Sequence, residues 1–92
     1  DAPKILLVHE PDFADFAQNR GIMLQLSGHS HGGQIRLPRV GALLLPFGGR
    51  KYPMGLRRMP DGMWLYTTRG VGLGMPPVRI NCPAEITLIT LT

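Results

Sequence analysis

Two short apolar runs flank a segment of helical spacing in the first third of the chain. Residues 4–9 form a continuous apolar run without alternation, which predicts a strand covered on both faces. Residues 22–27 form a second apolar strand of the same kind. Between them, Phe13, Phe16 and Ala17 recur at the spacing of one helix face and would form one buried stripe. The pattern therefore predicts a strand, a short helix and a strand.

Polar residues and a glycine mark the ends of the predicted helix. Asp12 precedes the helical segment and is expected to cap its N-terminus, with Asp15 three positions later as in a capping box. Gly21 stands where a residue in the left-handed conformation would end the helix. We interpret the two strands and the helix as one βαβ unit.

The βαβ unit is expected to bring two histidines together. The twelve residues between the strands are about the minimum for a parallel crossover, which would be right-handed. Parallel strands end at the same edge of a sheet, where α/β proteins bind their ligands. His9 ends the first strand, and His29 lies two residues beyond the end of the second. We therefore expect these two side chains to be neighbours.

The rest of the chain consists of short strands joined by turns rich in glycine and proline. The stretch 38–62 is of mixed character. Strands are predicted at residues 34–37, 63–69, 78–80 and 85–91, the last with clean alternation. Such strands and turns favour antiparallel pairing. The predicted fold class is therefore α/β, with one βαβ unit followed by mainly antiparallel strands.

The length limits the chain to one small domain, residues 1–92. Its only cysteine, Cys82, excludes a disulfide within the chain and is interpreted as a buried structural thiol. Because the chain begins at Asp1 and enters a strand almost at once, we interpret it as part of a longer polypeptide whose N-terminal portion carries any targeting segment. No apolar run reaches the roughly 18 residues that suggest a membrane span.

Positive charge concentrates in the segment 36–58. The formal net charge is +4, and this segment holds six arginine and lysine residues and no acidic residue. Such a segment attracts phosphates, anionic lipid or nucleic acid, or it is simply a solvated surface. Its apolar tip, residues 42–47, either dips into an anionic membrane surface or packs Leu43 and Leu45 into the core as an ordinary hairpin.

The histidines carry the candidate chemistry. In extended backbone, His29 and His31 would face the same way with Cα atoms about 6.6 Å apart. Rings so placed cannot easily share one ion unless the loop bends, but each can hold one of two ions about 3.5–4 Å apart. Ser30 would point away or support the histidines by a hydrogen bond. The alternative is that the histidines are only hydrogen-bonded structural residues. A two-metal centre also needs a bridging carboxylate, and none of the six acids is a convincing bridge. The sequence thus predicts that half of the site lies elsewhere.

Two motifs resemble those of a known family. Residues 6–12 (LLVHEPD) and 26–34 (LSGHSHGGQ) resemble the last two metal-binding motifs of the calcineurin-like metallophosphoesterase superfamily. The ending 69–88 resembles its bacterial branch of membrane-associated phosphodiesterases that act on lipid-linked nucleotide sugars. The resemblance implies the C-terminal part of a four-layer α/β/β/α sandwich with two divalent ions, manganese, zinc or iron. His9 and His29 would bind one metal and His31 the other.

The resemblance also implies a function for the longer protein. A hydroxide bridging the metals would attack phosphorus in line, so the protein would be a phosphodiesterase or phosphatase. The family's Asp-x-His, Gly-Asp and Gly-Asn-His motifs, with the general acid, are missing here, so the chain alone is expected to be inactive. The implied setting is a bacterial protein, cytoplasmic or peripheral to the membrane, with a phosphoester substrate that is lipid-linked in that branch.

Two other classes of function stay open at this stage. In the first, a non-catalytic module holds one structural zinc or none and binds anionic partners with its segment 36–58. In the second, the chain binds nucleic acid; Trp64 and Tyr66 lie on one strand face, but they are equally good core residues, so nucleic acid is not expected. One tightly held ion without turnover would favour the module, and two ions with hydrolysis would favour the enzyme.

Overall fold

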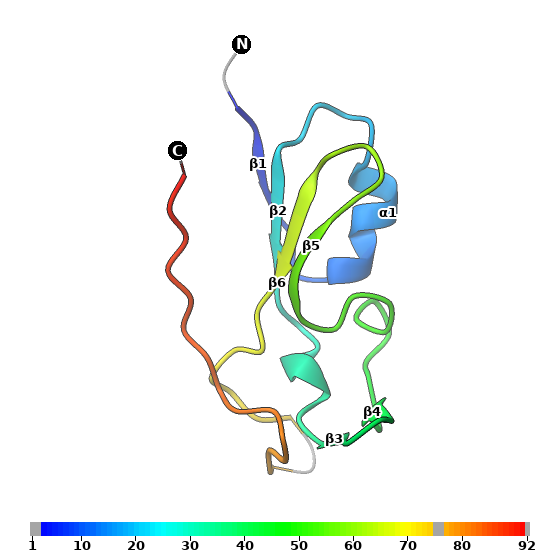
Figure 1. The fold of residues 1–92 in the computed structure, drawn as a ribbon, viewed down its shortest axis with the longest axis vertical. Helices are drawn as coiled ribbons and strands as arrows, with labels where there is room; N and C mark the ends of the chain where they lie inside the picture. The colour runs from blue at the N-terminus through cyan, green and yellow to red at the C-terminus, as the bar shows by residue number, and fades with distance from the viewer. Residues whose placement is uncertain (1–2, 75–76, 92) are drawn as a thin grey trace.

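The computed structural model describes residues 3–74 and 77–91. Its main sheet has the strand order β1-β2-β6-β5, with β1 at Ile5–Leu7, β2 at Leu24–Ser27, β6 at Trp64–Thr67 and β5 at Gly55–Arg58 (Figure 1). The β1–β2 pair is parallel, as the predicted βαβ unit requires. The pairing of β6 is mixed, since β6 runs parallel to β2 and antiparallel to β5. The predicted α/β class is confirmed. The later strands in the described residues are mainly antiparallel, as expected: 36–37 pairs antiparallel with 41–42 and 55–58 with 64–67, whereas 64–67 also runs parallel to β2.

The crossover between β1 and β2 is longer than predicted, and its helix is short and differently capped. It consists of a 3-10 turn, η1 (Pro11–Phe13), followed by α1 (Ala14–Ala17). Asp12 lies inside the first turn, where its carboxylate cannot cap, and the N-cap residue Glu10 makes no side-chain cap bond. The predicted cap and capping box are therefore wrong.

Asp12 instead anchors the basic segment. Its carboxylate accepts backbone N–H bonds of 3.0 to 3.1 Å from Arg50, Lys51 and Tyr52. Three amides around one carboxylate fix the start of the crossover to the segment 50–52.

The buried face and the end of α1 also differ from the prediction. Ala14 and Ala17 are buried, whereas Phe13 and Phe16 are 44% and 68% exposed, so the predicted aromatic stripe is wrong. A helix of one turn has room to bury only small residues against the sheet. The helix ends at Ala17. Gly21 does adopt a left-handed φ of 76°, but it lies four residues beyond the helix end, in the loop before β2, so it does not end the helix as predicted.

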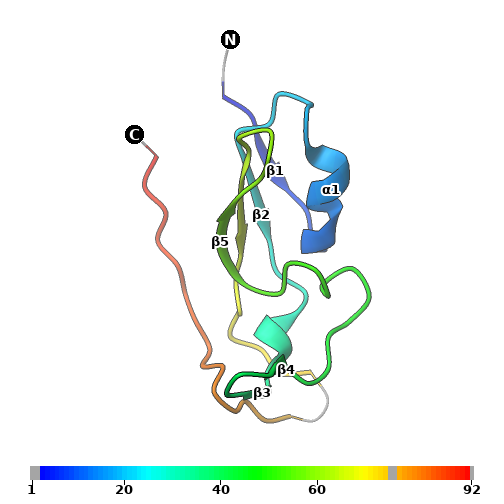
Figure 2. The ribbon, with the colours of Figure 1, turned by 45° about the vertical axis from the view of Figure 1, so that its right-hand side comes forward.

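The core lies on one face of the sheet. It comprises Ala14, Ala17, Tyr52, Met59, Met63 and Leu65. Figure 2 shows α1 against this side of the strands. On β1 and β5, Leu7 and Leu56 are 75% and 63% exposed, so the prediction that the first strand is covered on both faces is wrong for the described residues. In the described part of the chain, one helical layer covers one face of the four-stranded sheet, and the four-layer sandwich stays a prediction.

A smaller unit lies beyond the carboxyl ends of β2 and β6. It contains η2 (His31–Gly33) and the antiparallel pair β3 (Arg36–Leu37) and β4 (Gly41–Ala42) (Figure 1). The strand predicted at 34–37 is thus confirmed over its second half. No helix in the described residues has the length and apolar character to span a membrane.

The two C-terminal strands predicted at 78–80 and 85–91 are absent from residues 77–91. Ile80 makes only an isolated bridge to Ile35, and the final segment runs beside the sheet without joining it (Figure 1). Ile86 and Leu88 are each 92% exposed. Alternation predicts a strand only where a neighbouring strand satisfies its backbone, and the segment lies on no such edge here.

Candidate metal centre

The parallel β1–β2 pair brings His9 and His29 together. The pairing continues past both strands, with Val8 N–H donating to Leu26 O at 3.2 Å and Gly28 N–H to His9 O at 3.1 Å. The two imidazole rings lie with centroids 4.4 Å apart and planes inclined by 56°. The predicted juxtaposition is confirmed. Whether the rings bind a metal stays a prediction.

The loop that carries His29 and His31 is bent. Their φ values are 69° and 52°, in the left-handed region that few non-glycine residues adopt. Ser30 sets the bend, because its hydroxyl accepts from Gly32 N–H at 3.3 Å and donates to Pro53 O. The extended backbone assumed from the sequence is therefore wrong. Ser30 is buried and bonds to backbone atoms, in agreement with the prediction that it points away from the site.

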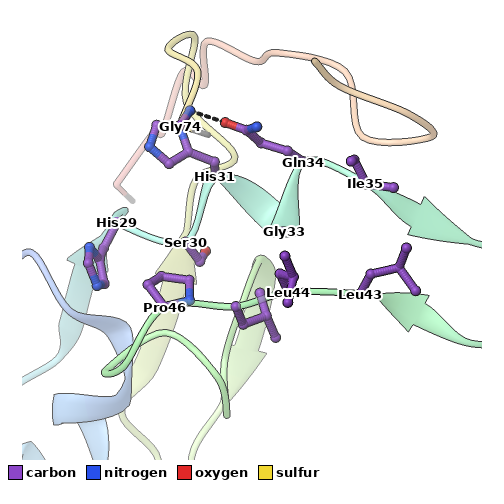
Figure 3. A pocket seen from close by; sticks show the side chains of 11 residues that line it. His29, Ser30, His31, Gly33, Gln34, Ile35, Leu43, Leu44, Pro46 and Gly74 are labelled. Atoms are coloured by element: carbon purple, nitrogen blue, oxygen red, sulfur yellow. Dashed lines mark hydrogen bonds between the residues drawn. The ribbon is translucent and has the colours of Figure 1, made fainter. Parts of the chain in front are cut away.

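The bend separates the two rings of the loop. Figure 3 shows His29 on the Pro46 side of the loop and His31 on the Gly74 side. His9 and His29 thus form one group, and His31 stands apart from them. Whether this grouping corresponds to two metals, as the family resemblance implies, stays a prediction.

Backbone carbonyls orient the rings of His29 and His31. His29 Nε2 lies 2.9 Å from Phe47 O, and His31 Nδ1 lies 3.3 Å from Gly72 O. Because a carbonyl only accepts, each of these nitrogens must carry the proton. In the neutral imidazole this leaves a lone pair on the other nitrogen, which is how carbonyl partners commonly orient metal-binding histidines.

Arg79, which the sequence did not single out as a site residue, holds the far side of the His31 loop. Its guanidinium donates to the carbonyl oxygens of Arg69 at 2.7 Å, Gly72 at 2.8 Å and Cys82 at 3.1 Å. A longer bond of 3.3 Å reaches His31 O. The one clue in the sequence is a lone arginine between two apolar residues, Val78 and Ile80.

Cys82 packs beneath the same loop. It is 1% exposed, and its Sγ lies 3.4 Å from the carbonyl oxygens of His31 and Gly32. The prediction of a buried structural thiol is confirmed. A Cβ at Gly32 would lie 2.5 Å from this sulfur, so only glycine fits there.

Four of the acidic residues are bound to other parts of the chain. Asp12 holds the segment 50–52, as described above. The Lys51 ammonium and then the Tyr52 hydroxyl lower the pKa of Asp15, and the backbone N–H groups of Asn19 and Met63 lower the pKa of Asp61. Glu85 bonds to Arg69 N–H at 2.8 Å and pairs with its guanidinium at 3.3 Å.

No complete metal site is present in the described residues. Within 3–74 and 77–91, no group of three or more His, Cys, Asp and Glu side chains is placed to hold an ion. His9 and His29 are in contact and His31 stands apart, and these three imidazoles alone do not make a complete centre.

An apolar pocket opens beside the His29–His31 loop. Its volume is about 420 Å³. One wall is the histidine loop with Gln34 and Ile35, and the other is the tip of the basic segment, as Figure 3 shows. The residues from that tip are Leu43, Leu44, Leu45 and Pro46.

The chain is similar to named proteins along almost its whole length. It is 44% identical over 87 residues to the uncharacterized metallophosphoesterase YkuE of Bacillus subtilis, which covers 95% of this chain. It is 38% identical over 89 residues, 97% of the chain, to the phosphodiesterase YaeI of Escherichia coli. The chain belongs to the metallophosphoesterase family. A Danio rerio protein named as a transmembrane protein with a metallophosphoesterase domain is 39% identical over 93 residues.

The metallophosphoesterases it resembles are much longer than this chain. The chain spans 30% of the B. subtilis protein and 32% of the E. coli protein. No protein-family profile matches it, and no solved structure matches it. The family predicted from the two histidine motifs is confirmed, while the metal ligands and the branch within the family stay predictions.

Proposed function

We propose that this metallophosphoesterase chain supplies His9, His29 and His31 to a dinuclear metal centre that hydrolyses phosphoesters in the longer protein. The observation that carries the proposal is the grouping of the rings. The ring centroids of His9 and His29 lie 4.4 Å apart at the end of a parallel strand pair, and His31 stands on the other side of a bent loop.

The donor set fits divalent ions such as manganese, zinc or iron, because imidazole suits each of them. When bound, two such ions would activate a water molecule and neutralise charge on the phosphoryl group. His9 and His29 would hold one ion and His31 the other. The carbonyls of Phe47 and Gly72 keep the rings turned so that one nitrogen of each is free to coordinate.

The bridging carboxylate, the other ligands and the general acid belong, in this proposal, to the remaining two thirds of the protein. The bonds of Asp12, Asp15, Asp61 and Glu85 support this division. The open face of the sheet also supports it, because Leu7 and Leu56 would be covered by further layers of a four-layer sandwich. Alone, this chain would be inactive.

Metal content and turnover of the full-length protein test the proposal. We expect two ions per protein and hydrolysis of bis-p-nitrophenyl phosphate, with loss of at least about 100-fold in kcat in His31→Ala because a ligand is removed. Lys4→Ala, on the exposed edge before β1, is the control and should keep both. One tightly bound ion without turnover would support instead a non-catalytic module that binds anions through its segment 36–58.

A peripheral membrane association is a second proposal, and it rests on the tip 42–47. Leu43 is not in the core as the hairpin alternative required; it is 51% exposed, and Leu44 and Phe47 are 75% and 81% exposed. Arg50 beside them is exposed too. Apolar side chains beside cations suit an anionic membrane surface that presents a lipid-linked phosphoester.

Vesicle binding tests this second proposal. We expect the full-length protein to sediment with phosphatidylglycerol vesicles at low salt and to lose binding when Leu44→Ser and Phe47→Ser are combined. Phe16→Ser, which changes an apolar residue that is 68% exposed on α1, should keep binding. Absence of binding at low salt would exclude the membrane surface.

A further inference from the structure

We propose that the pocket beside the His29–His31 loop is a subsite for an alkyl or aryl ester group of a phosphodiester. The inference rests on the proposed hydrolase and adds the substrate class. The site would select diesters by the apolar group on the phosphate, and a phosphomonoester would leave this subsite empty.

The position of the pocket is the first support. The rings of His29 and His31 line one end, so a phosphate held by metals at these histidines would have its ester oxygen at the mouth of the pocket. A volume of about 420 Å³ lies within the usual 300–1,000 Å³ range of small-molecule sites. It also exceeds the ~150 Å³ apolar cavity that accepts a benzene ring in another protein.

The chemistry of the lining is the second support. Beyond the histidines, the wall is largely aliphatic, with Ile35, Leu44 and Pro46 (Figure 3). Leu44 is 75% exposed, so an apolar ligand would remove from water a surface that the chain leaves exposed. No lysine or arginine lines the pocket, which disfavours a second charged group as the occupant.

The pocket is also built firmly. Leu43 N–H donates to Ile35 O at 3.2 Å and joins the two walls. Gly33, at a φ of 87°, lies so close to Ala42 that a Cβ there would collide with it, so its lack of a side chain lets the walls meet. Gln34 Oε1 accepts from Gly74 N–H and fixes the loop above (Figure 3). The ligand would therefore meet a formed wall rather than a loose loop.

A series of esters tests the subsite in the full-length protein. The substrates are p-nitrophenyl phosphodiesters whose second group is methyl, butyl or hexyl. Full burial of one methylene group would raise kcat/KM about 4-fold. Because the pocket is open on one side, we expect about half of that free energy for each methylene, or a 2-fold rise in kcat/KM. We expect kcat/KM to rise about 30-fold from the methyl to the hexyl ester.

Two matched variants of exposed apolar residues locate the effect. Leu44→Ser should bring the hexyl-to-methyl ratio close to 1, because it removes the apolar wall. The control, Phe16→Ser, changes an apolar residue of similar exposure, 68%, on α1 and should keep the ratio. A wild-type ratio near 1, or a gradient that survives Leu44→Ser, would overturn the subsite.

Binding of phosphonates separates this inference from the proposed function. If no ester is hydrolysed, the proposed function fails, and calorimetry with methyl- and hexylphosphonate still measures the pocket. Tighter binding of hexylphosphonate that Leu44→Ser abolishes supports the subsite. Equal binding of the two phosphonates overturns it. The subsite is also overturned if Leu44→Ser lowers the melting temperature of the full-length protein while phosphonate affinity does not depend on alkyl chain length, because the rest of the protein would then fill the pocket.

Discussion

Replacement of Arg79 by methionine tests how the His31 loop is held. The guanidinium makes three bonds of 3.1 Å or less, to the carbonyl oxygens of Arg69, Gly72 and Cys82. Methionine keeps an apolar stem of similar length and removes every donor. The change therefore removes the clamp while leaving most of the packing in place.

The size of the effect follows from these three bonds. A hydrogen bond from a charged donor contributes about 1.5–3 kcal/mol when buried, and we take about 1 kcal/mol each here because the carbonyls are half-buried and can turn to water. Arg79→Met should then destabilise the protein by about 3 kcal/mol. For a protein of roughly 290 residues, the length of the B. subtilis relative, this corresponds to a fall of about 5 °C in melting temperature.

Metal affinity distinguishes a positioning role from a purely structural one. Gly72 O accepts from His31 Nδ1 and is itself held by Arg79, so loss of the clamp frees the His31 ring to turn. Loss of such an outer partner typically weakens metal binding 10- to 100-fold. We expect that range for Arg79→Met in the full-length protein, and partial recovery in Arg79→Lys, whose single ammonium can meet only some of the carbonyls.

Metal titration and thermal unfolding with and without metal are the assays. Arg57→Met, on β5 at the opposite edge of the sheet from β1, is the control and should change neither the affinity nor, by more than about 1 kcal/mol, the stability. A lower melting temperature with unchanged metal affinity would make Arg79 structural only. An unchanged melting temperature would refute the clamp itself.

Three further outcomes follow from the structure. Gly70→Ala should lower the free energy of unfolding by about 1 kcal/mol, because of its left-handed φ alone. Gly32→Ala should lower it by about 2–4 kcal/mol, because the added Cβ also meets Cys82. Equal losses of unfolding free energy in chemical denaturation would contradict this contact. Lys51→Met should raise the pKa of Asp15, measured by NMR titration, because the ammonium lowers it; the stability from Asp15 is present above its unfolded pKa and is lost as pH falls through the folded pKa. Chelation of the full-length protein should lower its melting temperature, and re-addition of Mn²⁺ or Zn²⁺ should restore it.

The parallel strand pair could be predicted from the sequence, and with it the contact between His9 and His29. Two unbroken apolar runs at the minimum crossover distance permit few other arrangements, and strand register then fixes which residues end side by side. The family also followed from the sequence, because residues 6–12 and 26–34 resemble two metal-binding motifs of that family.

The features that the sequence did not reveal depend on distant contacts. The carboxylate of Asp12 is a plausible helix cap until the backbone of the segment 50–52 approaches it. The bend at Ser30 depends on Pro53, 23 residues away. The alternation of residues 85–91 indicates a strand, but no local pattern shows whether another strand lies beside it. In each case the deciding partner is remote in sequence.

The backbone of the histidine loop is the physical reason to expect a ligand there. His29, His31 and Gln34 all have left-handed φ values of 69°, 52° and 56°, which cost about 1 kcal/mol or more for each non-glycine residue. Glycine or asparagine would form the same bend at lower cost. Two imidazoles occupy these positions instead, each with one nitrogen on a carbonyl. Metal coordination by the other nitrogen would add to the bonds of Ser30, Gln34 and Arg79 that hold this strained backbone in place.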